Sequence, residues 1–117
     1  MSRMDKINRQ MQREISTIIH QDLGDSSLKF VTITHVHVSK DLRHARVYFS
    51  ILGDNHRLDT ILKKLAKAAG SIRKLVAGHM VMRNTPQLVF IYDESILLSA
   101  RIEETLQELK NDPEENP

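Results

Sequence analysis

The spacing of apolar residues predicts a helix at the start of the chain. Apolar side chains recur at helical intervals between residues 4 and 19, at Met4, Ile7, Met11, Ile15, Ile18 and Ile19. At about 100° per residue these side chains share one face, and Lys6, Arg9 and Arg13 fall on the other. The pattern therefore predicts an amphipathic helix with a basic outer surface. Gly24, Asp25 and two serines then end the helical pattern and predict a loop.

Two runs that follow, FVTITHVHVS and LRHARVYFSIL, are rich in β-branched residues and are separated by Lys40-Asp41. They predict a β-hairpin. In the second run, apolar and polar residues alternate, which is typical of a strand with one buried and one wet face. The first run is less regular, since its apolar residues change face between Ile33 and Val36. A bulge near Thr34-His35 would reconcile the two phases, and so would partial burial of both faces.

A second helical pattern covers residues 56 to 82, with Gly70 near its centre. The apolar residues before and after Gly70 project in almost the same direction, so their phase does not demand a break. Length suggests one, because a helix of about 25 residues would measure about 37 Å, whereas a compact domain of this size has a radius of gyration near 13 Å. We therefore expect two shorter helices that meet at Gly70.

The remaining pattern completes one domain. Arg83-Asn84-Thr85-Pro86 ends the helix, and QLVFIYD predicts a third strand that starts after the proline. Asp93 or Ser95 can cap a last helix whose apolar side is Leu98, Ile102, Leu106 and Leu109. The expected fold is α+β, in the order α-β-β-α-α-β plus a C-terminal helix, with helices on one face of a three-stranded sheet. Residues 1–109 form this single domain, and residues 110–117 are expected to be a disordered acidic tail.

Charge is distributed unevenly along the chain. The 117 residues have a formal net charge of only +2. Residues 57–83, however, hold seven basic side chains against Asp59 alone, while residues 93–117 hold eight acids against two basic side chains. A basic middle indicates a polyanionic partner, although solvated faces would give the same counts. Cysteine is absent, no signal peptide or membrane-spanning run is visible, and a cytoplasmic protein is expected.

The sequence offers little for catalysis. His35 and His37 share one strand face, and His44 lies across the predicted hairpin, so a zinc site was considered. No fourth ligand is evident, and exposed histidines on a strand are ordinary polar surface. The motifs of common hydrolases and nucleotide-binding enzymes are absent as well. We therefore expect no enzyme, no metal and no cofactor, and a small metal-dependent enzyme remains only a third hypothesis.

Basic residues give the strongest functional signal. Lys63 and Lys67 lie one turn apart, Arg73 and Lys74 follow Gly70, and Arg83 closes the segment. Together with Arg9 and Arg13 of the first helix, they could follow a phosphate backbone, which would give salt-dependent binding. Aromatic residues make up only 4% of the chain, so shape and backbone recognition of structured RNA is favoured over base stacking. The alternative is a protein-interaction module that docks this basic helical surface onto an acidic protein.

Several short motifs, taken together, resemble the bacterial ribosome-binding factor A family. They are VTITHVHVSKDLRHARVYFSI, Ala68-Ala69-Gly70-Ser71-Ile72-Arg73, Arg83-Asn84-Thr85-Pro86-Gln87-Leu88 and Asp93-Glu94-Ser95. The resemblance covers residues 1 to about 109 in order and spacing. It implies a type II KH-like domain in which an interhelical Ala-x-Gly kink, here Ala68, Ala69 and Gly70, replaces the usual G-x-x-G loop.

The resemblance also implies a function. Members of this family bind the free small (30S) ribosomal subunit and 16S rRNA, and they assist late maturation and rRNA processing, notably in the cold. They act without catalysis or a cofactor and are released with help from a ribosome-associated GTPase. We accordingly expect these partners, no membrane and a monomer. His79-Met80-Val81-Met82 is less basic than the corresponding run of many relatives, so this segment is expected to contribute less to phosphate binding.

Overall fold

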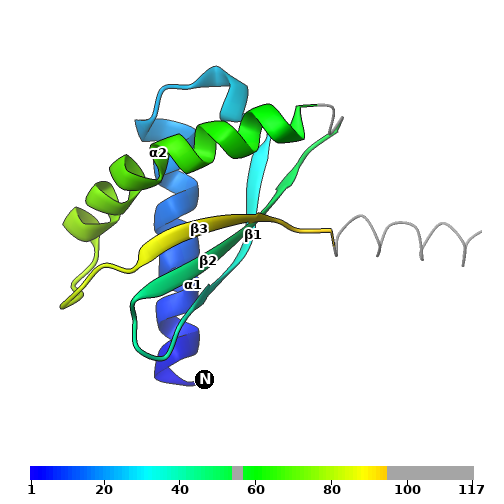
Figure 1. The fold of residues 1–117 in the computed structure, drawn as a ribbon. Helices are drawn as coiled ribbons and strands as arrows, with labels where there is room; N and C mark the ends of the chain where they lie inside the picture. The colour runs from blue at the N-terminus through cyan, green and yellow to red at the C-terminus, as the bar shows by residue number, and fades with distance from the viewer. Residues whose placement is uncertain (54–56, 95–117) are drawn as a thin grey trace, which may run out of the picture.

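The computed structural model describes residues 1–53 and 57–94 (Figure 1). Helix α1 (Arg3–Thr17) begins at a capping box, in which the Ser2 hydroxyl accepts a hydrogen bond from the Asp5 N–H while the Asp5 carboxylate accepts one from the Ser2 N–H, both at 3.1 Å. These two bonds satisfy N–H groups that a helix start leaves free. A π-helical turn, η1 (Ile18–Asp22), continues α1, and a short 3-10 turn, η2 (Ser26–Leu28), leads into the sheet.

The sheet has three strands in the order β1-β2-β3: β1 (Val31–Val38), β2 (His44–Ile51) and β3 (Gln87–Tyr92). Strands β1 and β2 form the predicted antiparallel hairpin, and β3 pairs with β2 in parallel, so the sheet is mixed. The register shifts between Ile33 and His35, which confirms a bulge at Thr34. Because the bulge restores the phase of β1, the four apolar residues of this strand all lie on the buried face: Val31, Ile33, Val36 and Val38.

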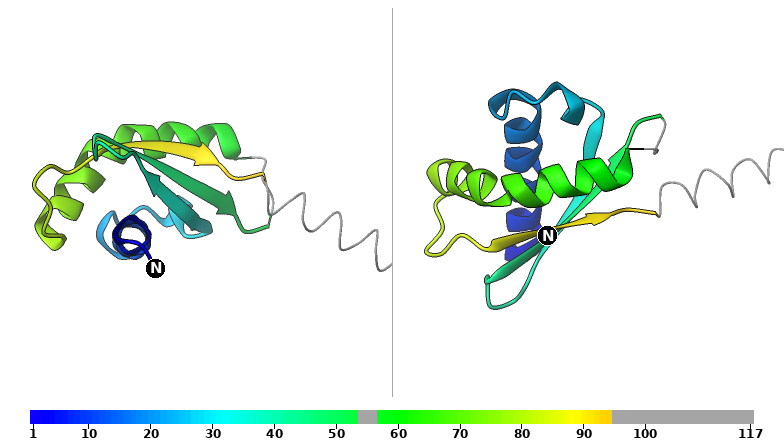
Figure 2. Two further views of the ribbon diagram at one scale, coloured as in Figure 1. Left: turned by 90° about the horizontal axis from the view of Figure 1, so that it is seen from below. Right: turned by 45° about the horizontal axis from the view of Figure 1, so that its top comes forward.

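Helix α2 (Leu58–His79) is one helix of 22 residues, so the prediction of two helices that meet at Gly70 is wrong. Gly70 keeps a negative φ inside the helix, and the stripe of buried residues passes it in phase, through Ile61, Leu65, Ile72 and Val76. The length argument failed because α2 is not confined to the sheet. Its C-terminal end extends past the start of β3, and residues 80–86 bring the chain back (Figure 1). Figure 2 (left) shows that α2 nevertheless bends along its length.

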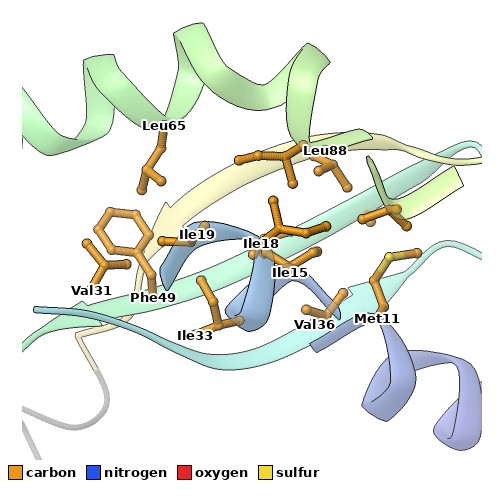
Figure 3. Close-up of a cluster of buried hydrophobic side chains, with 14 of the residues drawn as sticks. Met11, Ile15, Ile18, Ile19, Val31, Ile33, Val36, Phe49, Leu65 and Leu88 are labelled. Carbon is orange, nitrogen blue, oxygen red and sulfur yellow. The ribbon is translucent and has the colours of Figure 1, made fainter. Parts of the chain in front are cut away.

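The core is a single layer between the sheet and the two helices, both of which lie on one face of it, as predicted. Helix α1 packs mainly on β1, and α2 packs mainly on β3, at the other edge of the sheet. Figure 3 shows side chains from all these elements meeting in this layer, among them Ile15, Phe49, Leu65 and Leu88, which are buried. The described order is α-β-β-α-β. The expected C-terminal helix and acidic tail lie outside the described residues.

Candidate nucleic-acid interface

Three lysines of α2 form a row on its outer side. Lys63, Lys67 and Lys74 are exposed, and at about 100° per residue they project within about 40° of one another, opposite the buried stripe of the helix. Gly70, which is also exposed, lies on the same line between Lys67 and Lys74. We call Lys63, Lys67 and Lys74 the lysine row. Because α2 packs on the sheet through its opposite side, the row points away from the sheet.

The contacts of Lys64 distinguish it from the three lysines of the row. The Lys64 ammonium donates to the Ser27 hydroxyl at 2.5 Å and lies 3.5 Å from the Asp25 carboxylate. Hydrogen bonds from Ser27, with a smaller contribution from Lys64, hold the pKa of Asp25 below its usual value. By contrast, the lysine row makes no ion pair or side-chain hydrogen bond within residues 1–53 and 57–94. Lys64 therefore holds α2 against η2, whereas the lysine row is available to a ligand.

Arg73 lies on the flank of α2 and faces the segment that follows the helix. Its guanidinium donates two hydrogen bonds to the Thr85 carbonyl, from Nε at 3.0 Å and from Nη2 at 2.8 Å. These bonds fix the turn before β3, which also carries the exposed Arg83. Arg73 was predicted as a phosphate ligand, and the structure shows that it also positions this turn. Sequence reasoning missed this contact because the two residues are twelve positions apart and no local pattern connects them.

The residues expected at a kink lie beside a groove between α2 and β3. Ala69, Gly70 and Arg73 line the groove from the helix, and Leu88 and Phe90 line it from β3. Ala68, in contrast, packs against the core. Because Gly70 has no side chain, the backbone of α2 is uncovered where the lysine row, the groove and Arg73 come together.

Arg9 and Arg13 are exposed on the outer side of α1, as predicted. They belong to the helix over β1 rather than to the one over β3, so the predicted basic residues fall on two helices and one turn. Arg9 also lines a hollow between α1 and β1 with Asp5, Gln12 and His35. Arg9 therefore lies at the edge of the sheet, beside β1.

The three histidines considered as zinc ligands do not form a metal site. No group of three potential metal ligands comes together in the described part of the chain. His35 instead stacks on Tyr48, with ring centroids 4.1 Å apart, and its Nδ1 lies 3.6 Å from the Asp93 carboxylate. His37 and His44 are exposed on the same side of the sheet. The hypothesis of a zinc enzyme therefore loses its ligand set.

These features define a class of protein, a small two-layer α+β domain that presents a row of exposed cations on a helix. Within residues 1–53 and 57–94, no helix is long and apolar enough to cross a membrane. A domain of this kind is suited to binding a polyanion through its surface rather than to catalysis in a cleft.

Comparison with known proteins gives the family. The sequence model of ribosome-binding factor A matches residues 3–106, and the chain belongs to this family of non-catalytic ribosome-binding factors. The prediction that the chain is not an enzyme is thereby confirmed.

Solved structures agree with this assignment. The crystal structure of ribosome-binding factor A from Thermus thermophilus is 25% identical, with a TM-score of 0.69 over 78% of this chain and 97% of that one. A solution structure from Thermotoga maritima, of a putative ribosome binding factor A, is 30% identical, with a TM-score of 0.66 over 74% and 83%. A homology model of Thermus thermophilus ribosome binding factor A, as fitted into the cryo-EM map of its complex with the 30S subunit, is 26% identical, with a TM-score of 0.62 over 74% and 91%.

Proposed function

We propose that this protein binds the free small ribosomal subunit through 16S rRNA and assists late maturation and rRNA processing in the cytoplasm, without catalysis. Family membership supports the ribosome as partner, and a relative has been fitted into a map of a 30S complex. The observation on this chain that carries the proposal is the lysine row, whose three ammonium groups have no partner among the described residues while the adjacent Lys64 is paired.

Phosphate contact is the chemistry that such a row supports. Lysine ammonium groups along a helix meet successive phosphates of an RNA backbone, and each contact releases condensed counterions. Arg73, Arg83, Arg9 and Arg13 extend the proposed surface beyond the lysine row. In this proposal Gly70 shapes the surface and lets RNA approach the helix closely. Release from the subunit by a ribosome-associated GTPase, and action as a monomer, belong to the same proposal.

Co-sedimentation with small subunits across a salt series tests the lysine row. Lys63→Gln, Lys67→Gln and Lys74→Gln should each lower the slope of log affinity against log salt by about 0.7–0.9, the value for one lost phosphate contact. Lys64→Gln is the matched control, since it removes the same charge from the same helix and should leave the slope unchanged. Equal losses in all four variants would show that the effect is one of net charge, and would refute a phosphate-binding role of the row.

A second experiment separates RNA from an acidic protein as the partner. Binding to protein-free 16S rRNA should keep the same dependence on the lysine row. If the row matters for intact subunits but not for 16S rRNA alone, the alternative of a protein-interaction module is favoured. For maturation, cells depleted of this protein should accumulate unprocessed 16S rRNA, and the triple lysine variant should fail to restore processing.

A further inference from the structure

The second face of the sheet is bare in the described part of the chain. All the buried strand residues point toward the helices, so the residues between them form an open face. The strand register places His37 directly opposite Arg46, with Val89 of β3 beside Arg46 in turn. His44 lies on the same face, nearer the hairpin turn. Val89 is 45% exposed although it is apolar.

The half of the open face nearest the hairpin turn is cationic. We call this end of the domain the cationic sheet face and define it by five exposed residues, of which three lie on the open face of the strands (His37, His44 and Arg46) and two lie in the adjoining turn (Lys40 and Arg43). Asp41 is the acid of this turn. Its carboxylate already accepts hydrogen bonds from the Ser39 hydroxyl at 2.6 Å and from the Arg43 N–H at 3.1 Å. Asp93 lies beyond β3, where it accepts a hydrogen bond from Thr34 and approaches His35.

We propose that the cationic sheet face is a second surface for RNA phosphates, so that one chain can hold two RNA segments at once. The inference rests on the proposed function, because the ligand is RNA in both cases. Charge complementarity supports this ligand, because arginine and lysine are cations and the side chains of arginine, lysine and histidine all donate hydrogen bonds to phosphate oxygens. The lysine row and the cationic sheet face point in opposite directions from a two-layer domain, so a single short duplex cannot cover both.

The two surfaces differ in one chemical respect that an experiment can use. The cationic sheet face presents guanidinium and imidazole groups, whereas the lysine row presents ammonium groups alone. His37 faces Arg46 across the hairpin, and His44 is near Asp41 of the turn and pairs with Gln87 of β3. His35, beside Asp93, Tyr48 and the Asp5–Arg9 hollow, belongs to the other half of the face. The double replacement of His37 and Arg46 should therefore weaken binding at the cationic sheet face and leave binding at the lysine row unchanged.

The test uses the full chain and a short RNA duplex as the probe. Native mass spectrometry counts chains and duplexes in each complex, and a salt series gives the affinity. Wild-type protein should form a complex of one chain with two duplexes. The double variant His37→Gln, Arg46→Gln should retain one duplex and lose the slope of one to two phosphate contacts, about 0.7–0.9 each. Thr32→Gln, a neutral change on the same face, is the control and should behave like wild type.

The outcomes are separable. If wild-type protein binds a single duplex, or the double variant keeps both duplexes, the second surface is refuted while the proposed function stands. If wild-type protein binds no RNA, both are refuted. If the double variant keeps its RNA binding but no longer binds an acidic protein, the face belongs to a protein partner. Circular dichroism and melting of each variant establish that the substituted chains remain folded.

Discussion

Replacement of Gly70 by alanine should stabilise the protein. Gly70 lies in the interior of a continuous helix, is exposed, and has a negative φ. A Cβ built at this position meets no heavy atom of the described residues within 4 Å. The substitution therefore gains the helix propensity of alanine without a steric cost, which amounts to about 0.8–1.0 kcal/mol. Part of this gain comes from the unfolded chain, which loses conformational freedom when glycine is removed.

The gain is large enough to measure by thermal unfolding. For a domain of this size, a change of 1 kcal/mol shifts Tm by about 4–8 °C, so Gly70→Ala should melt several degrees higher. Gly78→Ala is a matched control in the last turn of the same helix, where a Cβ also meets nothing within 4 Å in the described part of the chain. The stability gained from Gly78→Ala should be smaller, because residues in the last turn of a helix are frayed and lose less conformational entropy on folding. A lower Tm for Gly70→Ala would refute the reasoning and would mean that Gly70 needs a conformation that alanine cannot adopt.

Binding measurements on the same variant separate two roles of Gly70. If the missing side chain only permits the helix to bend, the alanine variant should bind small subunits as tightly as wild type. If RNA approaches the backbone at Gly70, between Lys67 and Lys74, the variant should bind more weakly although it is more stable. The second result is the one that the proposed function expects. It could not be explained by unfolding.

Three further predictions concern packing, the turn before β3 and pH. Leu65→Ala removes a fully buried side chain and should cost about 2–5 kcal/mol in denaturant unfolding; a smaller loss would mean that α2 is loosely packed there. Arg73→Gln should speed hydrogen exchange in residues 84–88 by removing both bonds to the Thr85 carbonyl, and unchanged exchange would show that these bonds do not hold the turn. Hydrogen bonds from Ser2 lower the pKa of Asp5 from its ordinary 3.8, so this carboxylate stabilises the fold at neutral pH, and that contribution is lost as pH falls through the lowered pKa. Asp5→Asn, which removes the titrating carboxylate, should therefore weaken the loss of stability between neutral and acidic pH, and an identical pH profile would contradict this.

The sequence predicted the strands well because each has one buried face. In β1 the change of phase between Ile33 and Val36 could be resolved only by a bulge or by burial on both faces, and the bulge at Thr34 is the solution found. The order of the strands and the parallel pairing of β3 could not be read from the sequence. The pairing depends on how α2 crosses the sheet, and periodicity carries no information about that path.

The continuity of helix α2 through Gly70 was predicted wrongly from the sequence. The phase of the apolar residues on both sides of Gly70 favoured one helix, and the structure follows the phase. The opposing argument compared helix length with the size of a compact sphere, which does not limit a helix that extends past its sheet. Gly70 therefore lowers the stability of the helix locally. Packing does not require a glycine at this position, since no neighbour among residues 1–53 and 57–94 approaches it.

The roles of the basic residues of α2 depend partly on local sequence pattern and partly on tertiary contacts. Helical spacing alone puts Lys63, Lys67 and Lys74 on one line and Lys64 on another, so the lysine row could be found from sequence. That Lys64 is paired to η2, and that Arg73 is bonded to Thr85, depends on contacts 37 and 12 residues away along the chain.

These contacts divide the basic residues of α2 by role, although the sequence presents them as one cluster. Lys64 and Arg73 hold the helix to its neighbours, and because both are held, α2 is fixed in orientation with the lysine row turned outward. A loss of Lys64 should therefore act on binding through the position of the helix, and it should change affinity without the change in salt slope that marks a lost phosphate contact, whereas a loss of Arg73, which also belongs to the proposed surface, should change both. The salt slope and the affinity, measured together, therefore distinguish a residue that contacts RNA from one that only holds the helix in position. A measurement of affinity alone cannot make this distinction.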